Sequence, residues 1–328
     1  MNKEHVVYVT RRIPEVGLEM IRSACQVRLW EGEMPPPKEV LLQEVVDCDG
    51  LLCLLTDPMD AETIAAGQRL RVISQMAVGV DNVDLPAATA RGVPVGHTPG
   101  VLTEATADMA FALLMAAARR IPEGVEKVRA GRWRTWEPLA LLGADVWGAT
   151  LGIVGLGRIG TAVARRAQGF EMRVLYHDRV RNLEREAELG LTYASLDDLL
   201  AQADFVSLHC PLTPETHHLI GEQALRRMKP RGILINTSRG PVVDMGALVR
   251  ALREGWIAAA ALDVTDPEPL PPDHPLASLP NCIVVPHIAS ATVTARGRMA
   301  SMAAQNLLAG LRGERLPYCA NPEVYGKR

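Results

Sequence analysis

Aromatic residues are scarce in this chain, which has only 3 Phe, 5 Trp and 5 Tyr among its 328 residues. Hydrophobic residues nevertheless make up 48% of the sequence. Cores of ordinary size must therefore be built mainly from Val, Leu, Ile and Ala. A chain of this length suggests two domains rather than one.

Long apolar runs and an excess of one charge sign are also lacking. The longest apolar run, 109–118, has ten residues, whereas about 20 are needed to span a bilayer. The N-terminal apolar run is too short for a signal peptide, and no small-residue cleavage site follows it. The net charge is −3, and the arginines are scattered, unlike those of a nucleic-acid surface. We therefore expect a cytoplasmic protein that binds neither a membrane nor nucleic acid.

The six cysteines are too widely spaced for a metal or disulfide framework, because no pair has CxxC spacing. Cys53, Cys210 and Cys282 lie in apolar, strand-like runs. A cysteine in such a run behaves as a small buried hydrophobe. We expect neither a structural zinc site nor any other metal site.

Apolar strand-like runs alternate with helical patterns through the first hundred residues. Such a βαβ alternation predicts a parallel sheet with helices on both faces, which is complete near residue 100. The expected strands are Val6–Val9, Cys25–Trp30, Gly50–Leu55 and Arg71–Met76, and the expected helices are Glu15–Ala24, Lys38–Val46 and Ala61–Ala66.

A second alternating series begins near residue 150. Six strands would suit a dinucleotide-binding domain. They are expected at Leu151–Val154, Arg173–Tyr176, Asp204–Leu208, Gly232–Asn236, Ala258–Leu262 and Asn281–Val285.

Two further helices define how the domains connect. The helix expected over 105–118 is apolar nearly all round, which predicts burial between domains or between subunits. A final helix over 291–311 could cross back to the first domain. We therefore predict an α/β fold with two Rossmann-like domains and parallel sheets. The outer, substrate-binding domain is discontinuous, 1–100 plus 292–328, and the dinucleotide-binding domain is 101–291.

A glycine loop, GLGRIG, follows the first strand of the second series and leads into a helical stretch. Gly155 would permit the tight turn, Gly157 would let backbone N–H groups approach a pyrophosphate, and Gly160 would let helix and strand pack closely. Alone, such a motif is weak evidence. Between a strand and a helix it indicates a dinucleotide site.

The residue that selects the dinucleotide is expected at Asp178, which lies 18 positions after Gly160. A carboxylate there accepts hydrogen bonds from the ribose hydroxyls of NADH and repels the 2′-phosphate of NADPH. Arg179 and Arg181 follow, and they could hold that phosphate instead. We favour NADH and leave NADPH as the alternative.

Three polar residues follow later strands of the same series: Arg239, Glu268 and His287. Ligands of open α/β sheets bind outside the carboxyl ends of the strands, so these side chains could face one crevice. Arg can bind a carboxylate bidentately, His can protonate a carbonyl oxygen, and a carboxylate stabilises the imidazolium. Each could singly be an ordinary loop residue. Together behind a glycine loop they indicate 2-oxo acid reduction.

Several of these motifs resemble those of a known protein family. The runs VGLGRIG, NTSRGPVVD, ALDV with PEP, and PHIAS, spread over 154–290, are similar to those of the D-isomer-specific 2-hydroxyacid dehydrogenases. AVGVDNVD and RGVPVGHTPG extend the likeness upstream. Within that family, VTRRIP, GLLCLLTD, WRTWEPL and AQNLLAGLRGE resemble the glyoxylate/hydroxypyruvate reductases.

The resemblance implies roles for individual residues. Arg239 would bind the substrate carboxylate and carbonyl, His287 would be the general acid, and Glu268 would pair with His287. Asp263 would hold the nicotinamide carboxamide. The cofactor cleft would also be lined by Thr106, Arg158, Ile159, Pro211 and Thr237. Substrate would be contacted by Leu55, by the backbone N–H groups of Val78 and Gly79, and by Ser290.

The resemblance also implies a homodimer built on the cofactor domain, in which Trp136 reaches the substrate pocket of the partner subunit. A packed interface tryptophan is the alternative. The sequence departs from the resembled reductases at one position that bears on the cofactor. Those reductases commonly prefer NADPH and lack an acid at the position of Asp178.

Other functions remain open within and beyond this family. Glu268 disfavours a formate dehydrogenase, which carries Gln there, whereas phosphite, phosphoglycerate and other D-2-hydroxyacid dehydrogenases are alternatives. A non-catalytic, NAD-sensing scaffold resembling the transcriptional corepressors of this fold belongs to a different class. Substrates in the favoured interpretation are small 2-oxo or 2-hydroxy acids.

Overall fold

The computed structural model describes residues 4–326, and the chain forms two compact units. The outer unit contains residues 1–102 and 291–328, and the central unit contains residues 103–290. Each unit is built on its own parallel sheet, of five and seven strands respectively. This confirms the expected α/β fold with two parallel sheets.

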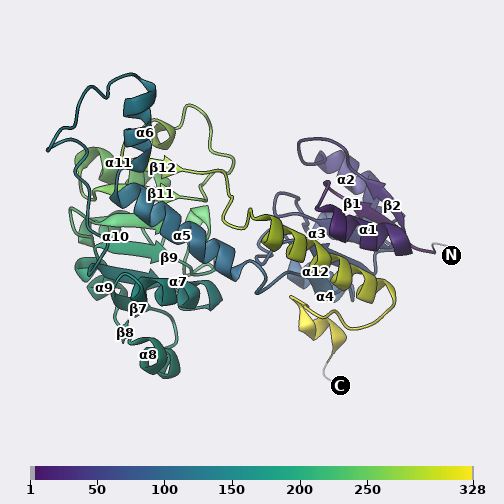
Figure 1. Ribbon diagram of the computed structural model, residues 1–328. Helices are drawn as coiled ribbons and strands as arrows, with labels where there is room; N and C mark the ends of the chain where they lie inside the picture. The colour runs from purple at the N-terminus through teal and green to yellow at the C-terminus, as the bar shows by residue number, and fades with distance from the viewer. Residues whose placement is uncertain (1–3, 327–328) are drawn as a thin grey trace. The chain divides into compact units, whose positions relative to one another are not determined.

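The outer sheet has the strand order β2-β1-β3-β4-β5, and every neighbouring pair is parallel (Figure 1). Helices α1 and α12 pack together on one face. Helices α2, α3 and α4 cover the other face, where Leu41, Ile64 and Ala88 enter one buried cluster with strand residues. The strands are β1 (Val6–Val9), β2 (Gln26–Leu29), β3 (Gly50–Cys53), β4 (Val72–Gln75) and β5 (Val95–Gly96), and the helices are α1 (Glu15–Ala24), α2 (Lys38–Val45), α3 (Ala61–Ala66), α4 (Leu85–Ala90) and α12 (Val293–Leu311).

Small residues allow α12 to pack closely within the outer unit. A Cβ at Gly310 would lie 2.5 Å from the side chain of Val72, so the helix can lie directly on β4 only without one. The Ser74 hydroxyl donates a hydrogen bond to the carbonyl of Ala303 at 2.8 Å. The C-terminal helix is therefore part of the same core as the N-terminal strands.

The central sheet has the strand order β12-β11-β10-β9-β6-β7-β8. Helices α5 and α7 pack on one face, and α9, α10 and α11 cover the other (Figure 1). The strands are β6 (Thr150–Val154), β7 (Arg173–His177), β8 (Thr192–Tyr193), β9 (Phe205–Leu208), β10 (Ile233–Asn236), β11 (Ala259–Leu262) and β12 (Cys282–Val284), and the helices are α5 (Thr103–Ala118), α6 (Ile121–Arg129), α7 (Arg158–Gln168), α8 (Leu183–Leu189), α9 (Leu196–Gln202), α10 (Glu222–Arg227) and α11 (Met245–Glu254).

The strand order of the central sheet reverses between β6 and β9, because the chain first adds β7 and β8 on one side of β6 and then β9 on the other. Ligands of open α/β sheets bind at such a reversal. Six strands were predicted here, and that number is wrong because the two-residue β8 is too short to leave a sequence pattern.

Within the single chain, helix α5 is buried on one face and exposed on another. One face, including Ala107, Phe111 and Leu114, is buried in the core of the central unit. On another face Ala112 is exposed, and the exposed Asp108 forms an ion pair of 2.7 Å with Arg166 of α7. The expected burial of α5 between domains or between subunits stays a prediction.

Residues 4–326 contain no helix that combines the length and the apolar character needed to cross a membrane.

Candidate active site

The glycine loop joins β6 to α7 in a geometry that requires glycine at its first and third positions. Gly155 has φ of 95°, and a Cβ there would lie 2.6 Å from the backbone nitrogen of Cys210. A Cβ at Gly160 would lie 2.1 Å from the Gly155 carbonyl oxygen, whereas one at Gly157 would meet nothing within 4 Å. The first and third glycines therefore close the turn, and the second faces open space at a helix N-terminus, where an anion is stabilised.

Asp178 lies beside this loop, at the end of β7. Its Oδ2 accepts a hydrogen bond of 2.7 Å from the Leu156 N–H, and its Oδ1 accepts one of 2.7 Å from the Arg179 N–H. The Gly155 N–H donates to the His177 carbonyl at 2.8 Å. The carboxylate is thus fixed next to the glycine turn.

Arg239 lies on a tight loop after β10. The Asn236 side chain organises this loop, because its Nδ2 donates to the Arg239 carbonyl at 2.9 Å and its Oδ1 accepts from the Ser238 N–H at 2.9 Å. A Cβ at Gly240 would lie 1.8 Å from the Thr265 carbonyl oxygen. The loops after β10 and β11 therefore lie in direct contact, and they bring Arg239 near the segment that carries Glu268.

His287 is held on a strained loop after β12. It has φ of 52°, a left-handed backbone conformation that residues other than glycine rarely adopt. The buried Asp263 holds this loop, since its carboxylate accepts from the Ile288 N–H at 2.7 Å and the Ala289 N–H at 3.0 Å, and its carbonyl accepts from the His287 N–H at 2.9 Å. Burial raises the pKa of Asp263, and those two N–H donors oppose the rise.

Glu268 and His287 form a close pair, with 2.5 Å between Glu268 Oε1 and His287 Nδ1. The side chains are 33% and 24% exposed, so solvent reaches both. With Nδ1 engaged, the Nε2 atom is the one left to exchange a proton with a ligand. The pair has the geometry of a carboxylate-supported acid and base.

The other expected site residues of the central unit, for cofactor and for substrate, lie in several places. Thr106 is buried in α5 and Thr237 is buried after β10, whereas Arg158 is exposed at the start of α7. Ile159 and Ser290 are half-buried, and Pro211 is exposed.

Sequence reasoning did not single out His209, which follows β9. Its Nε2 lies 2.8 Å from the Ser207 hydroxyl and its Nδ1 lies 3.4 Å from the Thr237 hydroxyl. Burial lowers the pKa of His209 to about 3, so the ring is neutral and links the ends of β9 and β10. The sequence signal that could have pointed to His209 was its position directly after an apolar strand.

In the outer unit, Leu55, Val78 and Gly79 lie on the loops after β3 and β4. Leu55 and Val78 are 37% and 36% exposed. Two amides that sequence reasoning missed connect these loops. The Asn82 amide donates to the Leu54 and Asp57 carbonyls at 3.0 and 2.8 Å, and the Gln75 amide donates to Asn82 Oδ1 at 2.6 Å.

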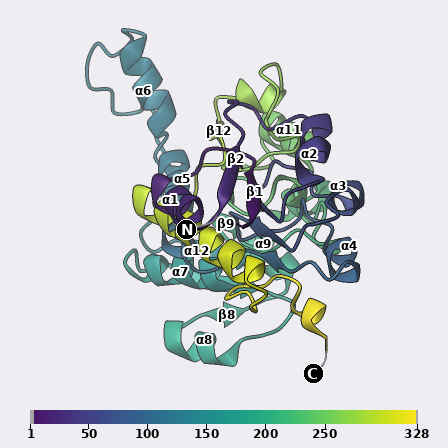
Figure 2. The ribbon, with the colours of Figure 1, turned by 90° about the vertical axis from the view of Figure 1, so that its right-hand side faces the viewer.

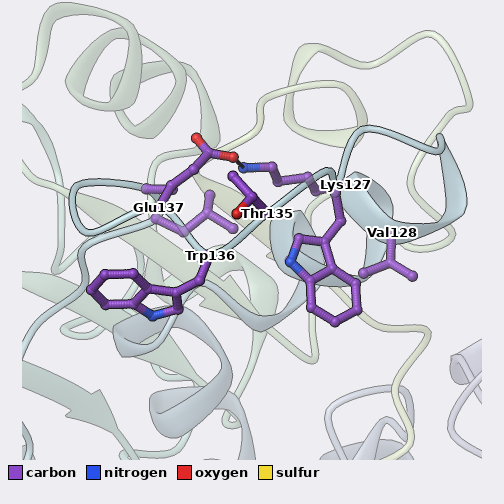
Figure 3. A pocket seen from close by; sticks show the side chains of 9 residues that line it. Lys127, Val128, Thr135, Trp136 and Glu137 are labelled. Atoms are coloured by element: carbon purple, nitrogen blue, oxygen red, sulfur yellow. Dashed lines mark hydrogen bonds and ion pairs between the residues drawn. The ribbon is translucent and has the colours of Figure 1, made fainter.

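Trp136 lies in the central unit, on the segment after α6, and its side chain is 80% exposed. Figure 3 shows it beside a shallow cavity of about 240 Å³. Trp133, 67% exposed, also lines it, and Lys127 and Glu137 form an ion pair of 2.7 Å there. In Figure 2, α6 and the loop after it stand apart from the other helices of the central unit.

Within the described part of the chain, no three His, Cys, Asp or Glu side chains gather in a way that could hold a metal ion.

Comparisons with known proteins bear on this geometry. The family described as "D-isomer specific 2-hydroxyacid dehydrogenase, NAD binding domain" matches residues 111–289. The curated glyoxylate reductase of Korarchaeum cryptofilum is 57% identical over 319 residues, which cover 97% of this chain and 96% of that protein.

Two solved structures extend the comparison to the fold. A protein of Thermus thermophilus has a TM-score of 0.91 at 51% identity, covering 96% of this chain and 99% of that one. An NADPH-dependent glyoxylate/hydroxypyruvate reductase of Sinorhizobium meliloti, in complex with NADP and malonate, has a TM-score of 0.84 at 32% identity, covering 99% and 98%. The chain therefore belongs to the D-isomer-specific 2-hydroxyacid dehydrogenases, and it is an NAD(P)-dependent oxidoreductase of that family.

Proposed function

We propose that this enzyme reduces glyoxylate to glycolate and hydroxypyruvate to D-glycerate, with NADH as the preferred reductant. The observation that carries the proposal is the Glu268–His287 pair at 2.5 Å, on the same edge of the sheet as the Arg239 loop. The names of the similar proteins from K. cryptofilum and S. meliloti support the substrate class.

His287 is the proposed general acid. When bound, a reduced nicotinamide would supply the hydride that reduces C2 of the 2-oxo acid. His287 Nε2 donates a proton to the carbonyl oxygen. Glu268 stabilises the imidazolium before the transfer and orients the ring through Nδ1. In the reverse direction the neutral imidazole accepts the hydroxyl proton.

Arg239 is proposed to bind the substrate carboxylate and to polarise the carbonyl. Its guanidinium stays charged at every working pH and presents a planar fork of donors that matches a carboxylate. Ser290 of the central unit, and Leu55 with the Val78 and Gly79 backbone N–H groups of the outer unit, are the further proposed substrate contacts.

The chain's residues fit a dinucleotide. The open space at Gly157 and the start of α7 suit a pyrophosphate, and the Asp178 carboxylate suits ribose hydroxyls and repels a 2′-phosphate. Asp263 would hold the nicotinamide carboxamide, although its carboxylate also holds the His287 loop. The remaining proposed cofactor contacts are Thr106, Gly155, Arg158, Ile159, Gly160, Arg179, Pro211 and Thr237.

The test is a panel of 2-oxo acids assayed with NADH and with NADPH. Glyoxylate and hydroxypyruvate should give the highest kcat/KM, and pyruvate and 2-oxoglutarate should be poor substrates. Phosphite with NAD⁺ tests the alternative phosphite dehydrogenase. Absence of turnover with every 2-oxo acid, while NADH still binds, would favour the non-catalytic scaffold.

We further propose a homodimer in which Trp136 reaches the substrate pocket of the partner subunit. The large exposed side chains of the 121–147 segment support it, because an apolar patch of this kind marks an interaction site. They are Ile121, Val125, Val128, Trp133, Trp136, Leu139, Leu142 and Trp147. Light scattering should report twice the chain mass, and Trp136→Ala should raise KM for glyoxylate. A monomer with full activity would refute the dimer.

A further inference from the structure

The segment after β7 carries two opposite determinants of dinucleotide choice. In Rossmann-type sites an acidic residue at this place binds the ribose hydroxyls of NAD, whereas a nearby arginine accommodates the 2′-phosphate of NADP. Here Asp178 is followed three residues later by Arg181. What Arg181 contacts therefore affects which dinucleotide binds.

Arg181 is held in a two-pronged ion pair. Its Nε donates to Glu186 Oε1 and its Nη2 donates to Glu186 Oε2, each at 2.8 Å. This fork-to-fork arrangement uses both carboxylate oxygens and one edge of the guanidinium. The guanidinium also lies 5.8 Å from the centre of the Tyr193 ring.

Glu186, at the middle of α8, is itself held in place by the hydroxyl of Tyr176. The hydroxyl of the fully buried Tyr176 donates to Glu186 Oε1 at 2.7 Å. The same hydroxyl accepts from the Asn182 N–H at 2.8 Å, which fixes its direction. The Glu186 side chain is only 13% exposed, whereas Arg181 is 56% exposed. The carboxylate is thus the fixed member of the pair.

Glu186 stays ionised in neutral solution. The hydrogen bonds from Arg181 and then from Tyr176 lower the pKa of its carboxyl to about 2. The negative charge that pairs with Arg181 is therefore present at every pH at which the enzyme would be assayed.

We propose that Glu186 is a cofactor-specificity residue, which holds the Arg181 guanidinium in an ion pair and so withholds it from the 2′-phosphate of NADPH. The proposal rests on the dinucleotide site of the proposed function. Asp178 disfavours the phosphate by repulsion, and Glu186 disfavours it by removing a cation that would offset that repulsion. Arg181 could contact that phosphate only if its pair with Glu186 were broken.

The expected effect follows from the strength of such a pair. An ion pair with one exposed partner is a weak interaction, and its loss corresponds to about a fivefold change in a binding constant at most. Removing the Glu186 charge should therefore lower the Kd of NADPH about fivefold. The Kd of NADH should change less than twofold, because NADH has no 2′-phosphate.

The test measures the Kd of NADPH and of NADH by fluorescence titration of the enzyme without substrate. Glu186→Gln is the first variant, because Gln can still accept the Tyr176 hydrogen bond. Glu184→Gln, which removes an exposed charge from the same helix, is the matched control and should leave both constants unchanged. These titrations involve no 2-oxo acid, so they are independent of the glyoxylate assignment.

Arg181→Met is the second variant in this titration test. In the wild-type background it should leave the Kd of NADPH unchanged, because Arg181 is already withheld. Combined with Glu186→Gln, it should abolish the fivefold gain. The proposal is overturned if Glu186→Gln leaves the NADPH Kd unchanged, if Glu184→Gln gives the same gain, or if the gain persists without Arg181.

Discussion

The carboxyl edges of the two sheets differ in the groups that they present and in how those groups are held. The central sheet carries charged side chains, Arg239, Glu268 and His287, on loops tied down by Asp263 and by the amide of Asn236. The outer sheet carries loops connected by the neutral amides of Gln75 and Asn82. We propose a division of work, in which the central unit carries proton transfer and the Arg239 contact to the substrate carboxylate, and the outer unit adds backbone contacts to the substrate.

The largest effect is expected at His287. His287→Ala should lower kcat about 10²- to 10⁴-fold, the usual contribution of a general acid. The Kd of NADH should stay within twofold of wild type, because proton transfer is not part of cofactor binding. Steady-state assays with glyoxylate and a fluorescence titration check both, and unchanged turnover would remove His287 from the mechanism.

The next largest effect is expected at Asp263, because its carboxylate accepts the hydrogen bonds that hold the His287 loop. In Asp263→Asn one oxygen becomes an NH₂ group that faces a backbone N–H, and leaving a buried donor unpaired costs about 1–3 kcal/mol. We expect a lower Tm and a loss of kcat of about tenfold. Thermal unfolding and kcat at saturating substrate measure the two effects. A variant with normal kcat would show that the loop keeps its shape without Asp263.

A substitution of Asn82 tests the proposed contribution of the outer unit to substrate binding. Asn82→Ala removes the hydrogen bonds to the Leu54 and Asp57 carbonyls, so the loops carrying Leu55 and Gly79 should loosen. KM for glyoxylate should rise several-fold while kcat changes less than twofold. Asn281→Ala is the matched control, because its amide also donates to two carbonyls, Leu252 and Ala258, within the central unit.

The control separates positioning from stability. Asn281→Ala should lower Tm by a similar amount and leave KM unaltered. If Asn82→Ala lowers kcat rather than raising KM, or if Asn281→Ala raises KM equally, the proposed division of work between the units is wrong.

At neutral pH the smallest effect is expected at His209, because its contribution concerns stability in acid. Its folded pKa, about 3, lies below the usual value near 6.5, so the unfolded chain takes up a proton first as pH falls. The free energy of unfolding should drop by at most about 1.4 kcal/mol per pH unit between pH 6.5 and 3 from this group. His209→Gln should unfold with a shallower pH dependence in that range. Equal slopes for both proteins would refute a buried neutral ring.

The sequence predicted those parts of the fold and site that leave a local pattern. The βαβ alternation located the long strands to within about two residues, and the glycine motif located the turn between β6 and α7. The short β5 and β8 were missed, because two residues cannot show a period.

The site was predictable where the chemistry is carried by rare side chains in ordered motifs, as at His287. It was not predictable where a common polar residue acts through the backbone. Asn82 and Gln75 connect loops by amide contacts that depend on the register of β3 and β4. The Glu186–Arg181 pair depends on the direction of α8, which no sequence spacing records.

The most direct test of the central claim is the primary deuterium isotope effect with NADH deuterated at the transferred position of C4. In a His287→Gln variant, slower proton transfer should make the chemical step limiting, so the isotope effect on kcat should rise above that of wild type. In Asn82→Ala the isotope effect on kcat should equal that of wild type, because that variant alters binding. An unchanged isotope effect in the slow His287 variant, or a rise in Asn82→Ala alone, would contradict the account.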